Sequence, residues 1–131
     1  AVIFTDKVTD EITELVRQLS DERSSIIAGF KDGTAELLEL NDIFRIYSSN
    51  GKVYAETANG TFTLRLRLYE AEQRLDSQIF VRISNSEIVN LKKVTNFDLS
   101  FVGTICVKLS NGTITYVSRR YVAKIKQILG I

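Results

Sequence analysis

The sequence predicts a mainly β, α+β fold, with one domain at residues 25–131 and a strand-helix appendage at residues 1–24. Three observations lead to this prediction. Short apolar runs bounded by Gly, Asn, Asp and Ser indicate about ten short strands. Only three segments repeat their apolar residues with the period of a helix. The chain has 131 residues, of which 44% are hydrophobic, and contains no proline, which suits a single globular domain.

The appendage begins with an apolar segment, residues 1–5, that is a candidate edge strand. In residues 6–20 one helical stripe follows, made of Val8, Ile12, Leu15, Val16 and Leu19. Acidic residues crowd the first half of this segment, where the helix dipole favours negative charge. The stripe either packs on the chain's own sheet or contacts another protomer or a partner, and the sequence leaves both explanations open.

The rest of the chain reads as hairpins. The expected strands are residues 25–30, 34–40, 44–47, 53–57, 61–66, 80–84, 88–91, 92–97, 104–109 and 113–117, and a short helix is expected at residues 67–75. In the last hairpin, a two-residue loop of Asn111 and Gly112 pairs Leu109 with Ile114 and Val107 with Tyr116. Those four apolar side chains then share one face, with Lys108 and Thr115 on the other.

The middle of the chain carries a polar break between two apolar half-strands, in residues 80–91. Arg82, Ser84, Asn85 and Ser86 can all donate hydrogen bonds there. Arg and Asn are the side chains that read guanine and adenine edges with two hydrogen bonds. The other explanation is an ordinary turn, which Asn and Ser also favour.

The last helix is predicted at residues 119–129, with Ser118 as its N-cap. Arg119 and Arg120 fall in its first turn, where the helix dipole disfavours cations. Two arginines at this end indicate an anionic partner such as phosphate, because helix N-termini and arginines both attract phosphate. The alternative is two solvated arginines.

Charge distribution and composition limit the classes of function that the chain can have. Residues 1–42 carry 4 basic and 10 acidic side chains, whereas residues 78–131 carry 8 basic and 2 acidic ones. This asymmetry indicates an anionic partner for the C-terminal part. The chain has no histidine and one cysteine, Cys106, which reads as a buried thiol in a reducing compartment. His-dependent catalytic triads and zinc sites are therefore excluded, and no cofactor, enzyme activity, signal peptide or membrane insertion is expected.

Four strings resemble the LytTR-type DNA-binding domain of bacterial regulators. They are residues 42–47 (DIFRIY), 80–91 (FVRISNSEIVNL), 109–112 (LSNG) and 116–121 (YVSRRY), and the resemblance covers residues 25–131. It implies an elongated fold of packed antiparallel sheets that reads the major groove through loops, without a helix-turn-helix. It also implies imperfect direct repeats near promoters as binding sites.

The resemblance also implies the contact residues. Three groups carry over by position: Asn50, Gly51 and Lys52; Arg82, Asn85 and Ser86; and Ser118, Arg119 and Arg120. Relatives often have histidine where this chain has Ser84, and some have one in the loop around Asn50. Many relatives carry a receiver domain, for which residues 1–24 are too short, so the chain is similar to stand-alone members.

The sequence thus predicts a cytoplasmic transcription regulator that binds double-stranded DNA as a homodimer. Base readout is expected from Arg82, Asn85 and Arg120. Phosphate contacts are expected from Lys52, Lys92, Lys93, Lys108, Arg119 and Lys124. The alternative is a protein-interaction module that uses the acidic N-terminal helix to bind a regulatory protein partner. RNA binding is a weaker third hypothesis, because most aromatic residues fall at core positions.

Overall fold

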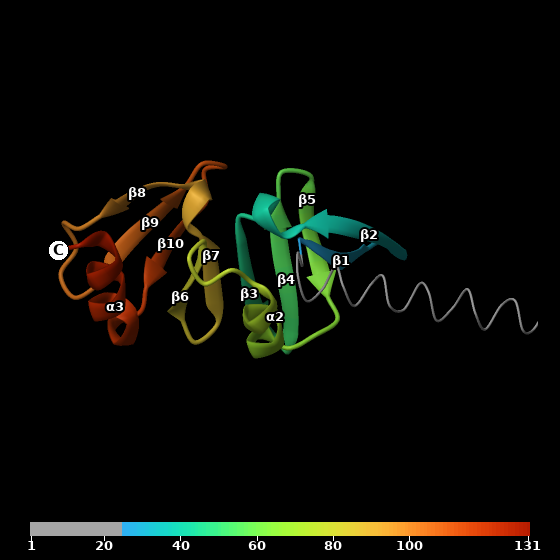
Figure 1. The fold of residues 1–131 in the computed structure, drawn as a ribbon, viewed down its shortest axis with the longest axis horizontal. Helices are drawn as coiled ribbons and strands as arrows, with labels where there is room; N and C mark the ends of the chain where they lie inside the picture. Colours follow the sequence, from blue (N-terminus) through green and yellow to red (C-terminus); the bar gives the residue numbers. More distant parts are fainter. Residues whose placement is uncertain (1–24) are drawn as a thin grey trace, which may run out of the picture.

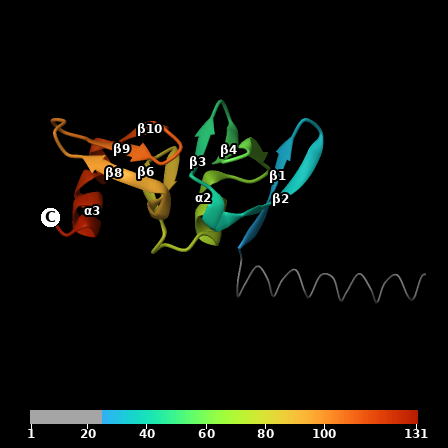
Figure 2. The same ribbon diagram turned by 90° about the horizontal axis from the view of Figure 1, so that it is seen from above.

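A computed structural model describes residues 25–131 of the chain. The strand, the helix and the separate appendage predicted for residues 1–24 lie outside the described residues. Within them, ten strands form one seven-stranded and one three-stranded antiparallel sheet, side by side along an elongated body (Figures 1 and 2). The mainly β fold that the sequence predicts is confirmed. None of the described helices is both long and apolar enough to cross a membrane.

The seven-stranded sheet has the order β2-β1-β5-β4-β3-β7-β6. Its strands are β1 (Ile26–Lys31), β2 (Thr34–Glu39), β3 (Arg45–Ser49), β4 (Lys52–Thr57), β5 (Gly60–Leu64), β6 (Phe80–Ser84) and β7 (Glu87–Asn90). Helix α2 (Leu68–Arg74) packs on one face, where its Leu68 and Ala71 join a buried cluster with Ile46, Phe62 and Ile88. This helix confirms the one predicted at residues 67–75.

The three-stranded sheet has the order β10-β9-β8. Its strands are β8 (Val94–Asp98), β9 (Ile105–Leu109) and β10 (Ile114–Val117), and helix α3 (Arg119–Leu129) follows, with the bounds predicted from the sequence. A second buried cluster joins Val107 of β9 and Ile125 of α3 to Val81, Ile83 and Val89 of the β6–β7 hairpin. That hairpin therefore lies between the two clusters, which explains why it is apolar on both faces. Figure 1 shows its strands between helices α2 and α3.

The predicted register of the β9–β10 hairpin is wrong by one residue. Lys108 pairs with Ile114, and Val107 pairs with Thr115. The loop has three residues, since the Leu109 N–H donates to the Thr113 carbonyl and the Gly112 N–H donates to the Leu109 carbonyl. A one-residue slip moves every side chain to the other face. As a result Ile114 and Tyr116 are more than half exposed, while Thr115 is buried.

The strand predicted at residues 92–97 begins later. Residues Leu91–Lys93 form a 3₁₀ helix, and β8 starts at Val94. The side chain of Asn90 accepts a hydrogen bond from the Lys92 N–H, which satisfies one of the free donors at the start of this helix. A second 3₁₀ helix, Leu40–Asp42, occupies the turn expected around Asn41. Cys106 is a free, buried thiol, as predicted.

Candidate nucleic-acid interface

The β3–β4 turn supplies Asn50, Gly51 and Lys52. Ser49 pairs with Lys52, so the loop has two residues, and both have positive φ: 53° at Asn50 and 79° at Gly51. This is the geometry of a type I′ turn, whose twist matches that of the flanking strands and for which Asn-Gly is the favoured sequence. All three residues are exposed. The turn therefore presents one amide and one ammonium group to solvent.

The β6–β7 turn supplies Asn85 and Ser86. Ser84 pairs with Glu87 across it, and both loop residues are exposed. The Ser48 N–H donates to the Ser86 carbonyl at 2.8 Å. This backbone bond joins the β3–β4 and β6–β7 turns at the same end of the seven-stranded sheet.

The side chain of Arg82 donates hydrogen bonds to backbone carbonyls of the β6–β7 turn. Its Nε donates to the Ser84 carbonyl at 2.9 Å, and its Nη2 donates to the Asn85 carbonyl at 2.8 Å. Its Nη1 pairs with the carboxylate of Glu72 in α2 at 2.6 Å. All three guanidinium nitrogens have partners within the protein. To reach a base, Arg82 would have to exchange at least one of these contacts.

The start of α3 lies beside the same turn. The Ser118 N–H donates to the Ile83 carbonyl at 2.8 Å, and the Tyr121 hydroxyl donates to Oδ1 of Asn85 at 3.2 Å. The second bond uses Oδ1 of the exposed Asn85, and Nδ2 of the same amide donates to no residue in the range 25–131. Ser118 takes the predicted N-cap position, but its side chain makes no capping bond.

The basic side chains of α3 extend this edge. Arg119 and Arg120 are exposed, and neither forms an ion pair with another residue in the range 25–131. Lys124 follows on α3 and lines a small cavity together with Arg82 and Glu72. The structure thus brings Asn50, Lys52, Asn85, Ser86, Ser118, Arg119 and Arg120 to one edge.

Three other candidates lie away from that edge. Lys92 and Lys93 follow the far end of β7, and Lys108 pairs with Ile114 at the end of β10 that is remote from Ser118. The Ser110 N–H donates to the Lys93 carbonyl at 2.7 Å, which places Lys92 and Lys93 beside the β9–β10 loop. The ammonium of Lys93 lies 5.0 Å from the ring centre of Phe44.

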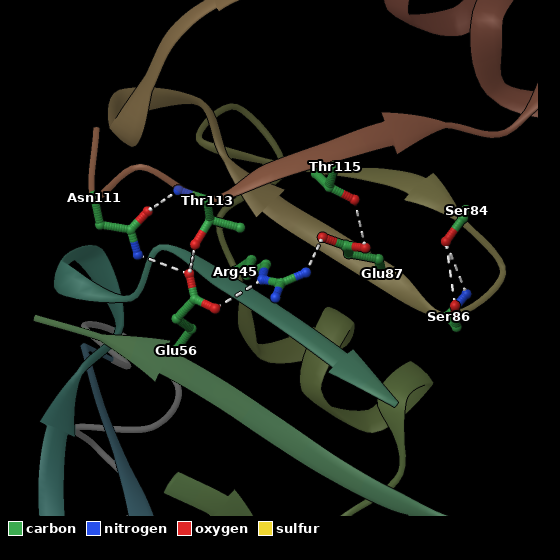
Figure 3. A network of polar contacts seen from close by, with 8 residues as sticks. All are labelled: Arg45, Glu56, Ser84, Ser86, Glu87, Asn111, Thr113 and Thr115. Carbon is green, nitrogen blue, oxygen red and sulfur yellow. Dashed lines mark hydrogen bonds and ion pairs between the residues drawn. The ribbon is translucent and has the colours of Figure 1, made fainter. Parts of the chain in front are cut away.

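A polar network connects the two sheets behind the turns (Figure 3). Arg45 on β3 donates to Glu56 on β4 at 3.0 Å and to Glu87 on β7 at 2.9 Å. Glu56 also accepts from Asn111 at 2.7 Å and from Thr113 at 2.6 Å, while Glu87 accepts from Thr115 at 2.9 Å. Each carboxylate therefore joins the seven-stranded sheet to the β9–β10 hairpin.

The network shifts the pKa of two of its members. Partial burial alone would raise the pKa of Glu56. The hydrogen bonds from Thr113, Asn111 and Arg45, together with the charge of Arg45, outweigh this effect, so the pKa of Glu56 lies below its ordinary value. Burial would lower the pKa of Arg45, but Glu87 and Glu56 raise it above its ordinary value. Both groups are therefore held in their charged forms.

The sequence reasoning missed the members of this network and Tyr121. The network joins three strands that are distant in the sequence, through Arg45, Glu87 and Thr115. A local sequence pattern cannot predict side-chain contacts between such strands. The only available signal was alternation. Arg45 and Glu56 fall on the opposite face of their strands from the buried Ile46 and Ala55, and as register partners they must lie side by side.

The described residues thus form an elongated antiparallel β domain that gathers polar and basic segments at one edge. The model of the LytTr DNA-binding domain family matches residues 33–130. The chain belongs to this family, as the four sequence strings predict.

Known proteins agree with this assignment. Two proteins of Staphylococcus aureus, from strains NCTC 8325 and COL, are each 35% identical to this chain over 130 residues, covering 98% of this chain and 88% of the relative. Both are named as uncharacterized HTH-type transcriptional regulators. The solved LytTr DNA-binding domain of a methyl-accepting/DNA response regulator from Bacillus cereus has the same fold. Its TM-score is 0.78 at 21% identity, over 82% of this chain and 98% of that domain.

Proposed function

We propose that the chain is a sequence-specific transcription regulator that reads double-stranded DNA in a bacterial cytoplasm. The observation that carries this proposal is the meeting of three segments at one edge of a LytTr domain: the β3–β4 turn, the β6–β7 turn and the start of α3. The regulator names of the Staphylococcus aureus relatives support the same function.

Readout in this proposal comes from turns inserted into the major groove. The groove is about 12 Å wide. The part of the β6–β7 hairpin that can enter it is the exposed turn of Asn85 and Ser86, because the strands themselves are packed between the two clusters. Among residues 25–131, α2 and α3 are separated by five strands, so they do not form a helix-turn-helix. Asn85 and Arg120 are the proposed base readers, because both are exposed and belong to neighbouring segments of the edge.

The remaining contacts are assigned by position. Arg82 is a proposed base contact that would act together with Asn85, whose turn it holds. Lys52, Arg119 and Lys124 are proposed to meet phosphates, and Asn50, Ser86 and Ser118 to add hydrogen bonds. Lys92, Lys93 and Lys108 are candidates for phosphate contact only where a bent or longer duplex reaches the other end of the domain.

Selection of bound sites from random duplex DNA tests the function directly. The full chain should enrich one motif, which we expect to occur as an imperfect direct repeat. Asn85→Ala should then weaken binding to that motif by about 1–3 kcal/mol and leave binding to a scrambled duplex nearly unchanged. Absence of any enriched motif would contradict sequence-specific binding.

We further propose that two copies occupy the repeat, with residues 1–24 forming the contact between them. Deletion of residues 1–21 should then give a folded monomer that binds a half-site weakly. Sedimentation of the truncated and full chains separates this outcome from a truncated chain that aggregates, which is expected if the segment covers the chain's own sheet.

The alternative function is a protein-interaction module that uses the acidic N-terminal segment. The observation in its favour is the excess of acidic over basic residues in residues 1–42. Retention on duplex DNA that falls with added salt is expected of the DNA-binding protein. A pure interaction module should show no such retention.

A further inference from the structure

Two of the proposed base readers, Asn85 and Arg120, are attached to different sheets. Asn85 lies in the β6–β7 turn of the seven-stranded sheet, whereas Arg120 follows β10 of the three-stranded sheet. The distance between the two groups therefore depends on how the sheets are joined near this edge. A rigid joint would let the protein require a fixed number of base pairs between the two segments of DNA that it reads.

Glu87 lies at this joint. It is the first residue of β7 after the turn, and it pairs with Ser84 on β6 and with Tyr47 on β3. One carboxylate oxygen accepts from Arg45 Nη1 at 2.9 Å, and the other accepts from Thr115 Oγ1 at 2.9 Å (Figure 3). The Glu87 side chain is only 12% exposed and Thr115 is 8% exposed, so water competes little for these bonds.

Arg45 keeps Glu87 in place. Its guanidinium bonds to Glu56 on the other side at 3.0 Å and lies 4.4 Å from the ring centre of Tyr47. A planar guanidinium can bond two carboxylates at once, which a lysine ammonium does with much weaker geometric control. The Glu87 carboxylate thus presents its free oxygen to β10 in a fixed position.

The second buried cluster packs β9, β10 and α3 against the β6–β7 hairpin, but apolar contact is non-directional. Two polar contacts also tie the start of α3 to the turn. The backbone bond between Ser118 and Ile83 fixes the position of the N-cap of α3 beside the turn. The bond between Tyr121 and Asn85 is exposed and uses the side chain that is proposed to read DNA. The bond from Thr115 to Glu87 is a shielded, directional contact on β10 itself, and it lies between this N-cap and the Glu56 contacts at the other end of the hairpin.

We propose that Glu87, held by Arg45, is a positioning residue that sets the spacing between the two base-reading segments of the protein. Its bond from Thr115 fixes the orientation of β10 and the start of α3 relative to the β6–β7 turn. The network thereby determines how many base pairs separate the positions read by Asn85 and Arg120. This inference rests on the proposed function and deepens it.

The experiment starts from the DNA motif selected by the full chain. The positions at which Asn85→Ala and Arg120→Gln relax base preference locate the two segments. Binding is then measured to the motif, to versions with one base pair inserted or removed between the segments, and to a scrambled duplex. The parent protein should bind the altered-spacing versions about tenfold more weakly than the motif.

Three variants separate positioning from stability. Thr115→Val keeps the size of the side chain and removes the hydroxyl, and it should reduce the spacing preference to about threefold or less without changing binding to the scrambled duplex. Thr115→Ser keeps the hydroxyl and should behave like the parent. Thr113→Val removes an equivalent bond to Glu56 at the remote end of the hairpin, so it should lower the melting temperature but keep the spacing preference.

Arg45→Lys gives a second, independent measurement. A lysine ammonium holds the two glutamates with much weaker geometric control, so this variant should also weaken the spacing preference. Retention of the tenfold preference by folded Thr115→Val and Arg45→Lys would overturn the inference. So would relaxation at the same base pair in Asn85→Ala and Arg120→Gln, or failure of both network variants to fold. If the parent selects no motif at all, the proposed function fails and not only this inference.

Discussion

Two asparagines on the β6–β7 hairpin show how the same side chain takes opposite roles. Asn85 is exposed in the turn, and its only side-chain bond within the described residues comes from Tyr121. Asn90 is fully buried at the far end of the hairpin. Its Nδ2 donates to the carbonyls of Asn41 and Ile43, both at 2.9 Å, and its Oδ1 accepts from the Lys92 N–H. One amide is available to a ligand, and the other satisfies three backbone groups.

We therefore expect Asn90→Ala to lower the free energy of unfolding by about 1–3 kcal/mol, because it leaves buried backbone groups without partners. Asn85→Ala should change it by less than about 0.5 kcal/mol, as is usual for an exposed position. Urea denaturation of both variants measures the difference. If Asn85→Ala is destabilised as much as Asn90→Ala, the amide of Asn85 is a structural part of the turn and not a base reader.

At the scale of elements, the sequence predicted which segments are strands and helices better than it predicted how they pair. Alternation and turn residues located the hairpins, and the helical stripe located α3. The β9–β10 register failed because Asn111 does not adopt the positive φ of a type I′ loop, and only Gly112, at 93°, does. The side chains of Asn111 and Thr113 instead bond Glu56, a partner that is 55 and 57 residues away. Such a contact depends on the tertiary structure, and local sequence propensity does not predict it.

The same distinction between local and tertiary information applies to the candidate site. Its exposed turn residues could be predicted, since Asn-Gly and Ser-Asn-Ser strings between apolar runs indicate surface turns. Their meeting at one edge could not be predicted, because it depends on a backbone bond from β3 to the β6–β7 turn and on another from the start of α3 to β6. The bonds of Arg82 within the protein could not be predicted either, because its partner Glu72 belongs to helix α2 whereas Arg82 lies on strand β6.

The first turn of α3 carries the next prediction. Arg119 and Arg120 lie at the positive end of the helix dipole, and no carboxylate within residues 25–131 pairs with either. Arg119→Gln and Arg120→Gln should therefore leave stability unchanged or raise it by about 0.3–1 kcal/mol. Thermal melts measure this, and a clear loss of stability in both would mean that internal contacts hold the two arginines.

The Glu56 contacts predict a pH dependence for the β9–β10 hairpin. The pKa of Glu56 in the folded protein is lower than its ordinary value of 4.5, so its ionised form stabilises the fold above that pH. This contribution is lost as the pH falls through the lower, folded-state pKa. Glu56→Gln should thus be less stable than the parent at pH 7, and the difference should shrink at about pH 3.

Urea denaturation at the two pH values measures that difference. Glu36→Gln, at an exposed position on β2, is the control for loss of one negative charge. A difference between parent and Glu56→Gln that is the same at pH 7 and pH 3 would show that the hydrogen bonds of Glu56 do not depend on its charge.

At the scale of the whole molecule, the basic residues proposed to meet phosphates fall into two groups at opposite ends of the strands. Lys52 and Arg119 belong to the edge formed by the turns, whereas Lys92, Lys93 and Lys108 lie at the other end of β7 and β9. The full length of these strands separates the two groups. A straight duplex laid along the edge of turns would therefore meet the first group and miss the second.

This geometry predicts which lysines control the salt dependence of DNA binding. Each phosphate contact adds about 0.9 to the slope of log K against log salt concentration, because bound counterions are released. Lys52→Gln should reduce that slope by about 1 and weaken binding equally on the selected motif and on a scrambled duplex. Lys92→Gln is the matched control, since it removes the same charge from an exposed position at the other end, and it should leave the slope unchanged. Equal reductions in both variants would mean that the DNA contacts both ends, which requires the duplex to bend around the domain.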